Sequence, residues 1–191
     1  MNRSAGLLLI VLLLFFTSGC FSHLALYDGP YRGRIIDDDT REPIEGVVVL
    51  GTWYKSIPTA AGSVSRFYDA RESVTDENGE FYFGGKGPRA MSNLEPVYLY
   101  VFKTGYEFFK ARWDSLDYDD MLKQIVEWEG SKPIIPLRKL TMEQRKRLGG
   151  PRRPDTKAKL ENIIHYLKEI DKERIAIGVE PFRTWRGKEY D

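Results

Sequence analysis

Seven short runs rich in β-branched and aromatic residues follow one another between residues 31 and 140, and turn residues separate them. Runs of this length are typical of β-strands, and several in close series are typical of a sandwich or a barrel. The sequence therefore predicts a mostly β protein built on an antiparallel seven-strand β-sandwich. The predicted strands lie within residues 31–37, 44–55, 66–76, 77–85, 97–103, 104–113 and 132–140.

Three local patterns refine this prediction. Asn78-Gly79 stands between two of the runs, and this dipeptide is a strong hairpin signal because both residues tolerate positive φ. The prolines at 133 and 136 have no backbone donor, which predicts an edge strand for the last run. Residues 114–129 fit either a short helix or a strand, and the spacing of their apolar residues favours the helix.

Residues 141–191 change character and predict an α-helical appendage followed by a tail. A short polar helix begins after Thr141, which is a suitable N-cap. After a linker rich in Gly and Pro, residues 156–177 carry apolar side chains at helical spacing, with Asp155 as the N-cap and Gly178 just beyond the end. The apolar stripe consists of Leu160, Ile163, Ile164, Leu167 and Ile170.

The first 19 residues have the three parts of a secretory signal peptide. Arg3 is the only charged residue before Asp28, large apolar residues fill positions 7–16, and small residues follow. A membrane-spanning helix needs about 20 apolar residues, so this run is too short to cross a bilayer by itself. We therefore expect residues 1–19 to be a targeting signal and residues 20–30 to be a tether.

Cys20 is the only cysteine of the chain, and it directly follows the small residues Thr17, Ser18 and Gly19. The stretch "TSGC" resembles the lipobox of bacterial lipoprotein signal peptides, in which the cysteine is lipidated and becomes the new N-terminus. The resemblance implies that Cys20 carries a lipid anchor with palmitate-type acyl chains. A plain signal peptide with a free thiol and an uncleaved anchor are the alternatives. A free thiol would be a reactive liability in an oxidising compartment, which favours lipidation.

The residue after the cysteine bears on the destination of the protein. Position 21 is Phe rather than Asp. By the sorting rule of enterobacterial lipoproteins, this residue implies the outer membrane, with the protein facing the periplasm.

Several short motifs follow one another in a fixed order through the middle of the chain. A strand with Gly leads to "PIEG" and an apolar run, then to "TDENGEF", and then to a strand that ends in "KTGY". This order resembles the carboxypeptidase regulatory-like domain over residues 31–140. The resemblance implies a transthyretin-like β-sandwich and no peptidase activity. The matching residues are Gly33, Pro43, Ile44, Gly46, Thr75, Asp76, Asn78, Gly79, Phe81, Lys103, Gly105 and Tyr106.

Charge and composition exclude several classes of function. Removal of residues 1–19 takes away Arg3 and leaves 28 basic and 28 acidic residues, so the mature chain is close to neutral. A nucleic-acid-binding domain carries a basic field, so nucleic acid is not an expected partner. His23 and His165 are the only histidines, and neither has a second ligand at the spacing of a zinc site. The sequence predicts no catalytic residue, no metal and no cofactor.

Tyr98, Tyr100 and Phe102 form a candidate aromatic binding face, because they alternate with aliphatic residues along one predicted strand. If exposed, this row of rings would suit a carbohydrate. The alternative, which we favour, is that the apolar stripe of the C-terminal helix covers the face, since both surfaces need an apolar partner.

These features together predict an exported, lipid-anchored protein of the cell envelope that acts as a non-catalytic structural or interaction module. Its expected partners are the membrane, through Cys20, and an envelope protein or glycan. A carbohydrate-binding module and an envelope hydrolase are the alternatives. The first would show an open row of aromatic residues, and the second would show clustered carboxylates or a nucleophile with its base in a cleft.

Overall fold

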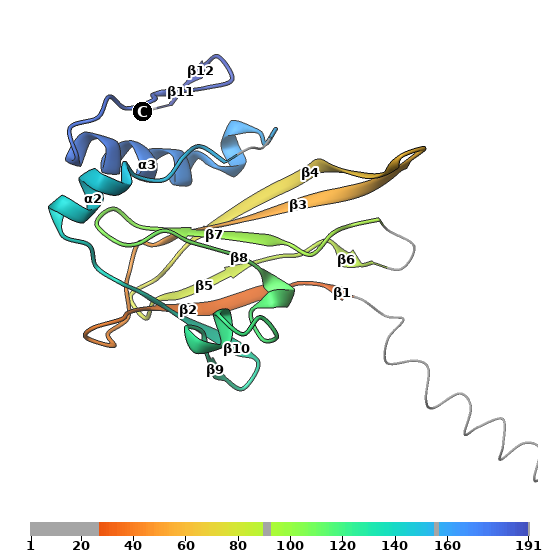
Figure 1. Cartoon of the computed structure of the whole chain (residues 1–191), viewed down its shortest axis with the longest axis horizontal. Helices are drawn as coiled ribbons and strands as arrows, with labels where there is room; N and C mark the ends of the chain where they lie inside the picture. The colour runs from red at the N-terminus through yellow and green to blue at the C-terminus, as the bar shows by residue number, and fades with distance from the viewer. Residues whose placement is uncertain (1–26, 90–92, 155–156, 191) are drawn as a thin grey trace, which may run out of the picture.

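The computed structural model describes residues 27–89, 93–154 and 157–190, which form two packed β-sheets and a C-terminal helical layer (Figure 1). One four-stranded sheet has the order β5 (Glu80–Phe83), β2 (Tyr31–Asp37), β10 (Lys132–Leu137) and β9 (Glu127–Glu129). The other has the order β4 (Gly62–Val74), β3 (Val48–Thr59), β7 (Tyr98–Phe102) and β8 (Phe109–Arg112). The prediction of a mostly β fold is confirmed, whereas Cys20 and Asp155 lie outside the described residues.

The main core lies between the two sheets and is filled by alternate side chains of their strands. Leu99 and Val101 of β7 point into this core, as do Phe81 and Phe83 of β5. Trp53 of β3 is fully buried in the same cluster. This alternation is what the period of two in the sequence predicted, because successive side chains of a strand point to opposite faces.

The outer face of the β4-β3-β7-β8 sheet is buried as well. Tyr100 and Phe102 of β7 belong to a second cluster, together with Leu167 and Ile170 of α3 (Ile164–Ala176). Figure 1 shows α3 lying along this side of the molecule, over β3 and β7. The sheet is therefore covered on both faces, which explains the nearly continuous apolar run "VVVLGTW" in the sequence.

The strand β10 lies inside its sheet instead of at the edge. It pairs in parallel with β2 from Ile134 to Leu137 and antiparallel with β9 from Lys132 to Ile134. The two sheets thus hold eight strands, one of the sheets is mixed, and the prediction of seven antiparallel strands is wrong in these respects. Pro136 is tolerated because β9 is short and does not reach it, so the strand has a free edge there.

Residues 114–129 form neither the short helix that we predicted nor a continuous strand. Two 3-10 turns, η2 (Trp113–Ser115) and η3 (Leu122–Gln124), lead into β9. Leu116 is buried in the main core, whereas Met121 is 76% exposed, so the apolar residues do not share one helical face. The Asp119 carboxylate accepts hydrogen bonds from the backbone of Met121 and Leu122 and so begins the second turn.

The Asn78-Gly79 turn connects the two sheets and does not close a hairpin. The strands before and after it, β4 and β5, belong to different sheets. Asp76 Oδ1 accepts hydrogen bonds from the backbone of Asn78 and Glu80, at 3.0 and 2.8 Å. Gly79 has a φ of 72°, and a Cβ atom there would lie 2.3 Å from the Ile35 carbonyl oxygen. The predicted turn is confirmed, but the predicted hairpin is wrong. A turn that closes a hairpin and a turn that crosses between sheets both need a residue that tolerates positive φ, so the sequence does not distinguish them.

The C-terminal region contains two helices and a small hairpin. In α2 (Met142–Leu148), Thr141 and Gln144 form a reciprocal capping box, which confirms the predicted N-cap. The helix predicted for residues 156–177 is interrupted, because a 3-10 turn, η4 (Leu160–Asn162), and a non-helical Ile163 precede α3. Gly178 has a φ of 80° just after the end of α3, as expected for its position.

Two pairs of two-residue strands complete the fold. β11 (Thr184–Trp185) pairs with β12 (Lys188–Glu189), and β1 (Tyr27–Asp28) pairs with β6 (Gly87–Pro88). Among the helices of the described residues, none combines the length and the apolar character needed to span a bilayer.

Candidate ligand-binding cleft

The candidate aromatic face lies under the C-terminal layer. Tyr100 and Phe102 are 8% and 1% exposed, and Tyr98 is partly buried against the same cluster. The rings of Tyr100 and Tyr166 of α3 are 6.3 Å apart between centroids and meet edge to face. Tyr100 and Phe102 are therefore core residues and offer no open platform for a sugar ring, and the covering of this face agrees with the alternative that we favoured.

Buried carboxylates of α3 hold the helix against the loop after β7. Glu169 accepts a hydrogen bond from the backbone of Thr104 at 2.8 Å, and Glu173 accepts one from Gly105 at 3.0 Å. Glu173 also forms a two-point ion pair with Arg145 of α2, at 2.9 and 2.7 Å. These carboxylates join α2, α3 and the sheet, and each of them is already engaged by donors of the protein itself.

The titration of Glu169 reflects this engagement. Burial by itself would raise the pKa of the Glu169 carboxyl. The hydrogen bonds from Lys172 and Thr104 outweigh burial, so the pKa lies below its ordinary value. Glu169 is therefore an ionised structural carboxylate at neutral pH and lacks the raised pKa of a general acid.

Two further carboxylates hold the C-terminal layer in place, one by joining α3 to the sheet and the other by joining the tail to α3. Glu72 of β4 accepts hydrogen bonds from the backbone of His165 and Tyr166, at 3.0 and 2.9 Å, and so caps the N-terminus of α3 from another element. Asp171 accepts hydrogen bonds from the backbone of Phe182 and Arg183, at 2.7 and 2.9 Å. Their partners show that both groups have structural roles.

A buried carboxylate also lies where the described chain begins. Asp28 of β1 accepts hydrogen bonds from the Tyr31 hydroxyl at 2.7 Å, from Trp53 Nε1 at 2.9 Å and from the Lys86 backbone at 2.8 Å. Burial and the bond to Asp28 raise the pKa of Tyr31. The fold therefore begins by Tyr27, inside the segment 20–30 that we expected to be a tether. Within the described ranges, no group of three or more His, Cys, Asp and Glu side chains is placed to hold a metal ion.

A small apolar pocket of about 260 Å³ lies between α2, α3 and the loop after β7. Phe102, Phe108, Leu148 and Pro151 contribute to its wall, and the ion pair of Arg145 lies at its side. Because the Arg145 guanidinium is already bound at two points by Glu173, the pocket presents little free polar chemistry to a ligand.

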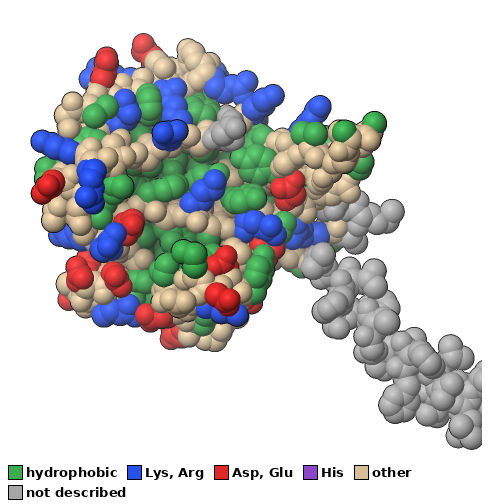
Figure 2. Space-filling model, viewed as in Figure 1, with side chains coloured by type: hydrophobic (Ala, Val, Ile, Leu, Met, Phe, Trp, Pro, Cys, Tyr) green, Lys and Arg blue, Asp and Glu red, His purple; other side chains and the backbone are tan. Residues whose placement is uncertain are grey.

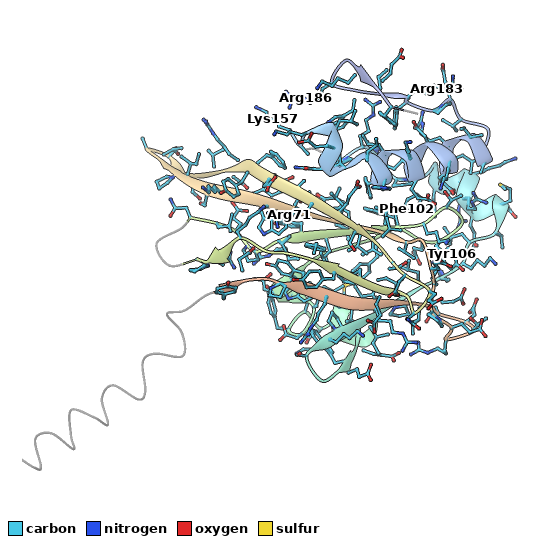
Figure 3. All side chains as sticks on the ribbon, turned by 180° about the vertical axis from the view of Figure 1, so that it is seen from behind. Arg71, Phe102, Tyr106, Lys157, Arg183 and Arg186 are labelled. Carbon is cyan, nitrogen blue, oxygen red and sulfur yellow. The ribbon has the colours of Figure 1, made fainter. Side chains whose placement is uncertain are left out.

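A larger cleft of about 670 Å³ lies between the segment before α3 and the β11–β12 hairpin. Four of its lining residues are cationic, Lys157, Lys159, Arg186 and Lys188, and one is acidic, Glu161. Figure 3 shows Lys157 and Arg186 next to each other at this end of the C-terminal layer. Lys and Arg side chains also gather over the upper part of the molecule in Figure 2, where this layer lies.

The floor of the cleft is apolar and well fixed. Trp185 is buried, and its Nε1 donates a hydrogen bond to the Ala158 carbonyl oxygen at 2.9 Å. Arg186 donates a hydrogen bond to the Lys157 carbonyl oxygen at 3.1 Å. These two bonds tie the hairpin to the facing segment, so the cationic side chains stand on a defined frame. The remaining lining residues are Leu160 and Ile164.

Sequence reasoning missed this cleft because its two halves are separated along the chain. "KAKLE" at 157–161 and "WRGK" at 185–188 each mix cations with apolar residues, but neither forms a known motif. The tail after residue 178 also has no period that would predict a structure. The two stretches meet only in the folded chain, where Trp185 bonds the Ala158 carbonyl oxygen and Arg186 bonds the Lys157 carbonyl oxygen.

Comparison with known proteins found no match to this chain among family models, curated proteins or solved structures.

Proposed function

We propose that the protein is a lipid-anchored module of the cell envelope that binds an anionic ligand in the basic cleft and has no catalytic activity of its own. The observation that carries the proposal is the cluster of four cations around a defined apolar floor. Four positive charges and one negative charge attract anions, and a floor with Trp185 and Ile164 suits the apolar part of a ligand. The ligand class is therefore an anionic envelope molecule that bears phosphate or carboxylate groups.

The sequence supports the location. The ten apolar residues before "TSGC" fit an exported lipoprotein held at a membrane through Cys20. Several acyl chains on one cysteine anchor a protein firmly, whereas one chain binds only marginally. We place the protein on the outer membrane, facing the periplasm, and assign its two sheets to the transthyretin-like sandwich of carboxypeptidase regulatory-like domains.

A non-catalytic role is supported by the chemistry of the buried acids. Glu72, Asp171 and Glu173 accept hydrogen bonds from backbone groups or from Arg145. A hydrolase of the kind we considered needs carboxylates that face a substrate, or a nucleophile beside its base. The acids described here face donors of the protein instead.

Binding of tripolyphosphate, measured by calorimetry, tests the cleft. Lys157 and Lys188 line the cleft, so the double change Lys157→Gln and Lys188→Gln should raise Kd about tenfold or more and flatten its dependence on salt. The matched control is the change of Lys146 and Arg147, two exposed cations on α2, to Gln. Equal binding by both double variants would show that the cleft is not the anion site.

Metabolic labelling with palmitate tests the anchor. The change Cys20→Ala should abolish the label and leave an uncleaved precursor. A variant that is still labelled and still processed would show that another residue carries the lipid.

A further inference from the structure

The hairpin of β3 and β4 extends beyond the rest of its sheet as a two-stranded arm (Figures 1 and 3). β7 pairs with β3 only from Val48 to Thr52, whereas β3 and β4 stay paired out to Thr59 and Gly62. The segment that begins at Asn93 adds two backbone hydrogen bonds of 2.8 Å. The Asn93 carbonyl oxygen accepts from the Ser56 N–H, and the Glu95 N–H donates to the Tyr54 carbonyl oxygen. Past Ser56, the strand pairings of the described residues join the arm only to itself.

The tip of the arm, residues 57–64, is uncharged and apolar. Its sequence is "IPTAAGSV", and Ile57 and Val64 face each other across the two strands. These two side chains are 37% and 49% exposed. A soluble β-ribbon normally places polar residues at such a tip, so the exposed apolar pair indicates a contact surface.

A collar of positive charge lies directly behind the tip. Lys55 and Arg66 are partners across the two strands, and residues 54–68 contain no Asp or Glu. The Lys55 ammonium lies 3.8 Å from the centre of the Tyr68 ring. An apolar end followed by cations and an aromatic ring is the arrangement that suits a bilayer interface, where acyl chains, anionic headgroups and water succeed one another.

The base of the arm fixes its direction. A bulge interrupts the register between Trp53 and Tyr54, and bulges increase the local twist of a ribbon. The Tyr54 ring then packs edge to face on Phe67 and on Tyr98, with centroids 5.9 Å apart in both contacts. The arm is thus anchored to the sheet by aromatic contacts and holds its tip away from the body.

The tip lies at the same end of the molecule as the start of the described chain. Figures 1 and 3 view the molecule from opposite sides, and both show the arm and β1 directed toward that end. Cys20 precedes Tyr27 by seven residue steps, which span about 25 Å at most. A lipid on Cys20 would therefore hold this end of the molecule close to the membrane.

We infer that the tip of the β3–β4 arm docks on the bilayer that holds the lipid of Cys20, with Lys55 and Arg66 at the level of anionic headgroups. The inference rests on the anchor in the proposed function. A second copy of the chain is a poorer occupant, because Pro58 removes a donor from the free edge of β3 and so opposes strand addition.

The test uses the full lipidated chain in vesicles of phosphatidylethanolamine and phosphatidylglycerol. Cys20 is the only native cysteine and is blocked by lipid, so the change Ala60→Cys gives one free thiol at the tip for an environment-sensitive fluorophore. If the tip lies in the bilayer, the emission of the fluorophore at position 60 should shift to the blue. Spin-labelled lipids should quench it strongly and iodide in the water should quench it weakly. The matched control is Glu143→Cys on α2, where iodide should quench and spin-labelled lipids should not.

The collar is tested in the same vesicles. The changes Lys55→Gln and Arg66→Gln should reduce the lipid quenching at position 60 at least about twofold, and the loss should be absent in vesicles of pure phosphatidylcholine. Collar variants that leave the quenching unchanged would overturn the role of the two cations.

The remaining outcomes separate the arm from the anchor. Flotation of the chain with the vesicles reports on the anchor. If the chain floats but the fluorophores at positions 60 and 143 are quenched alike, the arm proposal is overturned and the anchor stands. A tip that is shielded from iodide but not quenched by spin-labelled lipids is covered by protein, and it also overturns the proposal. A chain that does not float overturns the anchor and the arm proposal with it.

Discussion

The change Leu167→Ala tests whether the C-terminal layer and the two sheets form one cooperative unit. Leu167 of α3 is fully buried in the cluster with Leu50 of β3 and Phe102 of β7. Truncation of such a leucine removes buried apolar surface and leaves a cavity, which costs about 2–5 kcal/mol. The site lies between a helix and a sheet that are fixed by other contacts, so it cannot easily collapse. We therefore expect a loss of about 3 kcal/mol, a large part of a total stability of about 5–15 kcal/mol.

Urea unfolding of the mature chain with Cys20 changed to Ala measures this loss. With a slope of about 2 kcal/mol per molar urea, a loss of 3 kcal/mol moves the midpoint by about 1.5 M. The matched control is Lys168→Ala, the next residue of the helix, which should move it by less than about 0.3 M. Trp53 reports on the main core and Trp185 on the outer cluster, so single-tryptophan variants follow the two clusters separately.

The reasoning would be refuted by a Leu167→Ala midpoint equal to that of Lys168→Ala. Separate transitions for Trp53 and Trp185 would show that the appendage unfolds on its own. Ile164, which the sequence pattern places in the same stripe, is a weaker test because it is only partly buried and lines the basic cleft.

Three further predictions concern buried charges. The change Glu173→Ala should cost about 3 kcal/mol in urea unfolding, because it leaves Arg145 unpaired at 12% exposure, and the double change Arg145→Met with Glu173→Leu should recover much of that loss. The change Glu72→Gln should cost about 1 kcal/mol in the same assay, because a neutral amide is a poorer cap for the N-terminus of α3. Glu169 has a pKa below its unfolded value of about 4.3, so its contribution is present above that pH and lost as the pH falls through the lower folded value. The gap in urea midpoint between the native chain and Glu169→Gln should therefore be widest near pH 7 and narrow below about pH 4, and a gap that widens with acid would contradict this sign.

The sequence predicted those parts of the fold that depend on local pattern. The alternation in "VYLYVFK" predicted which side chains of β7 enter each core, and Thr141 and Gly178 marked helix ends that the structure confirms. Two of the errors, the place of β10 and the Asn78-Gly79 hairpin, concern long-range pairing. The parallel partner of β10 lies about a hundred residues earlier, and Asn78-Gly79 gives the same local signal whether the next strand stays in the sheet or crosses to the other one.

The candidate cleft could not be predicted for a related reason. A basic patch made from two short stretches has no sequence signal, because only the folded chain joins them. Here they are joined by the hydrogen bonds that Trp185 and Arg186 donate to the backbone of residues 157 and 158. The burial of the acids of α3 has no sequence signal either, since a charged side chain on a helix usually faces water. Glu169 and Glu173 are buried against donors of the loop after β7 and of α2, and Asp171 is buried against the backbone of residues 182 and 183.

The same acids connect the fold to the proposed binding role. A sheet that is apolar on both faces needs a cover, and α3 supplies one with a short stripe and a row of buried carboxylates. Burial of each carboxylate costs free energy unless its donors are in place, so α3 can pack on the sheet in one position only. The position of α3 on the sheet also determines where the segment before α3 meets the β11–β12 hairpin. The cations of the cleft are therefore positioned by the same contacts that close the fold, and a change that loosens α3 should weaken anion binding even when it lies outside the cleft.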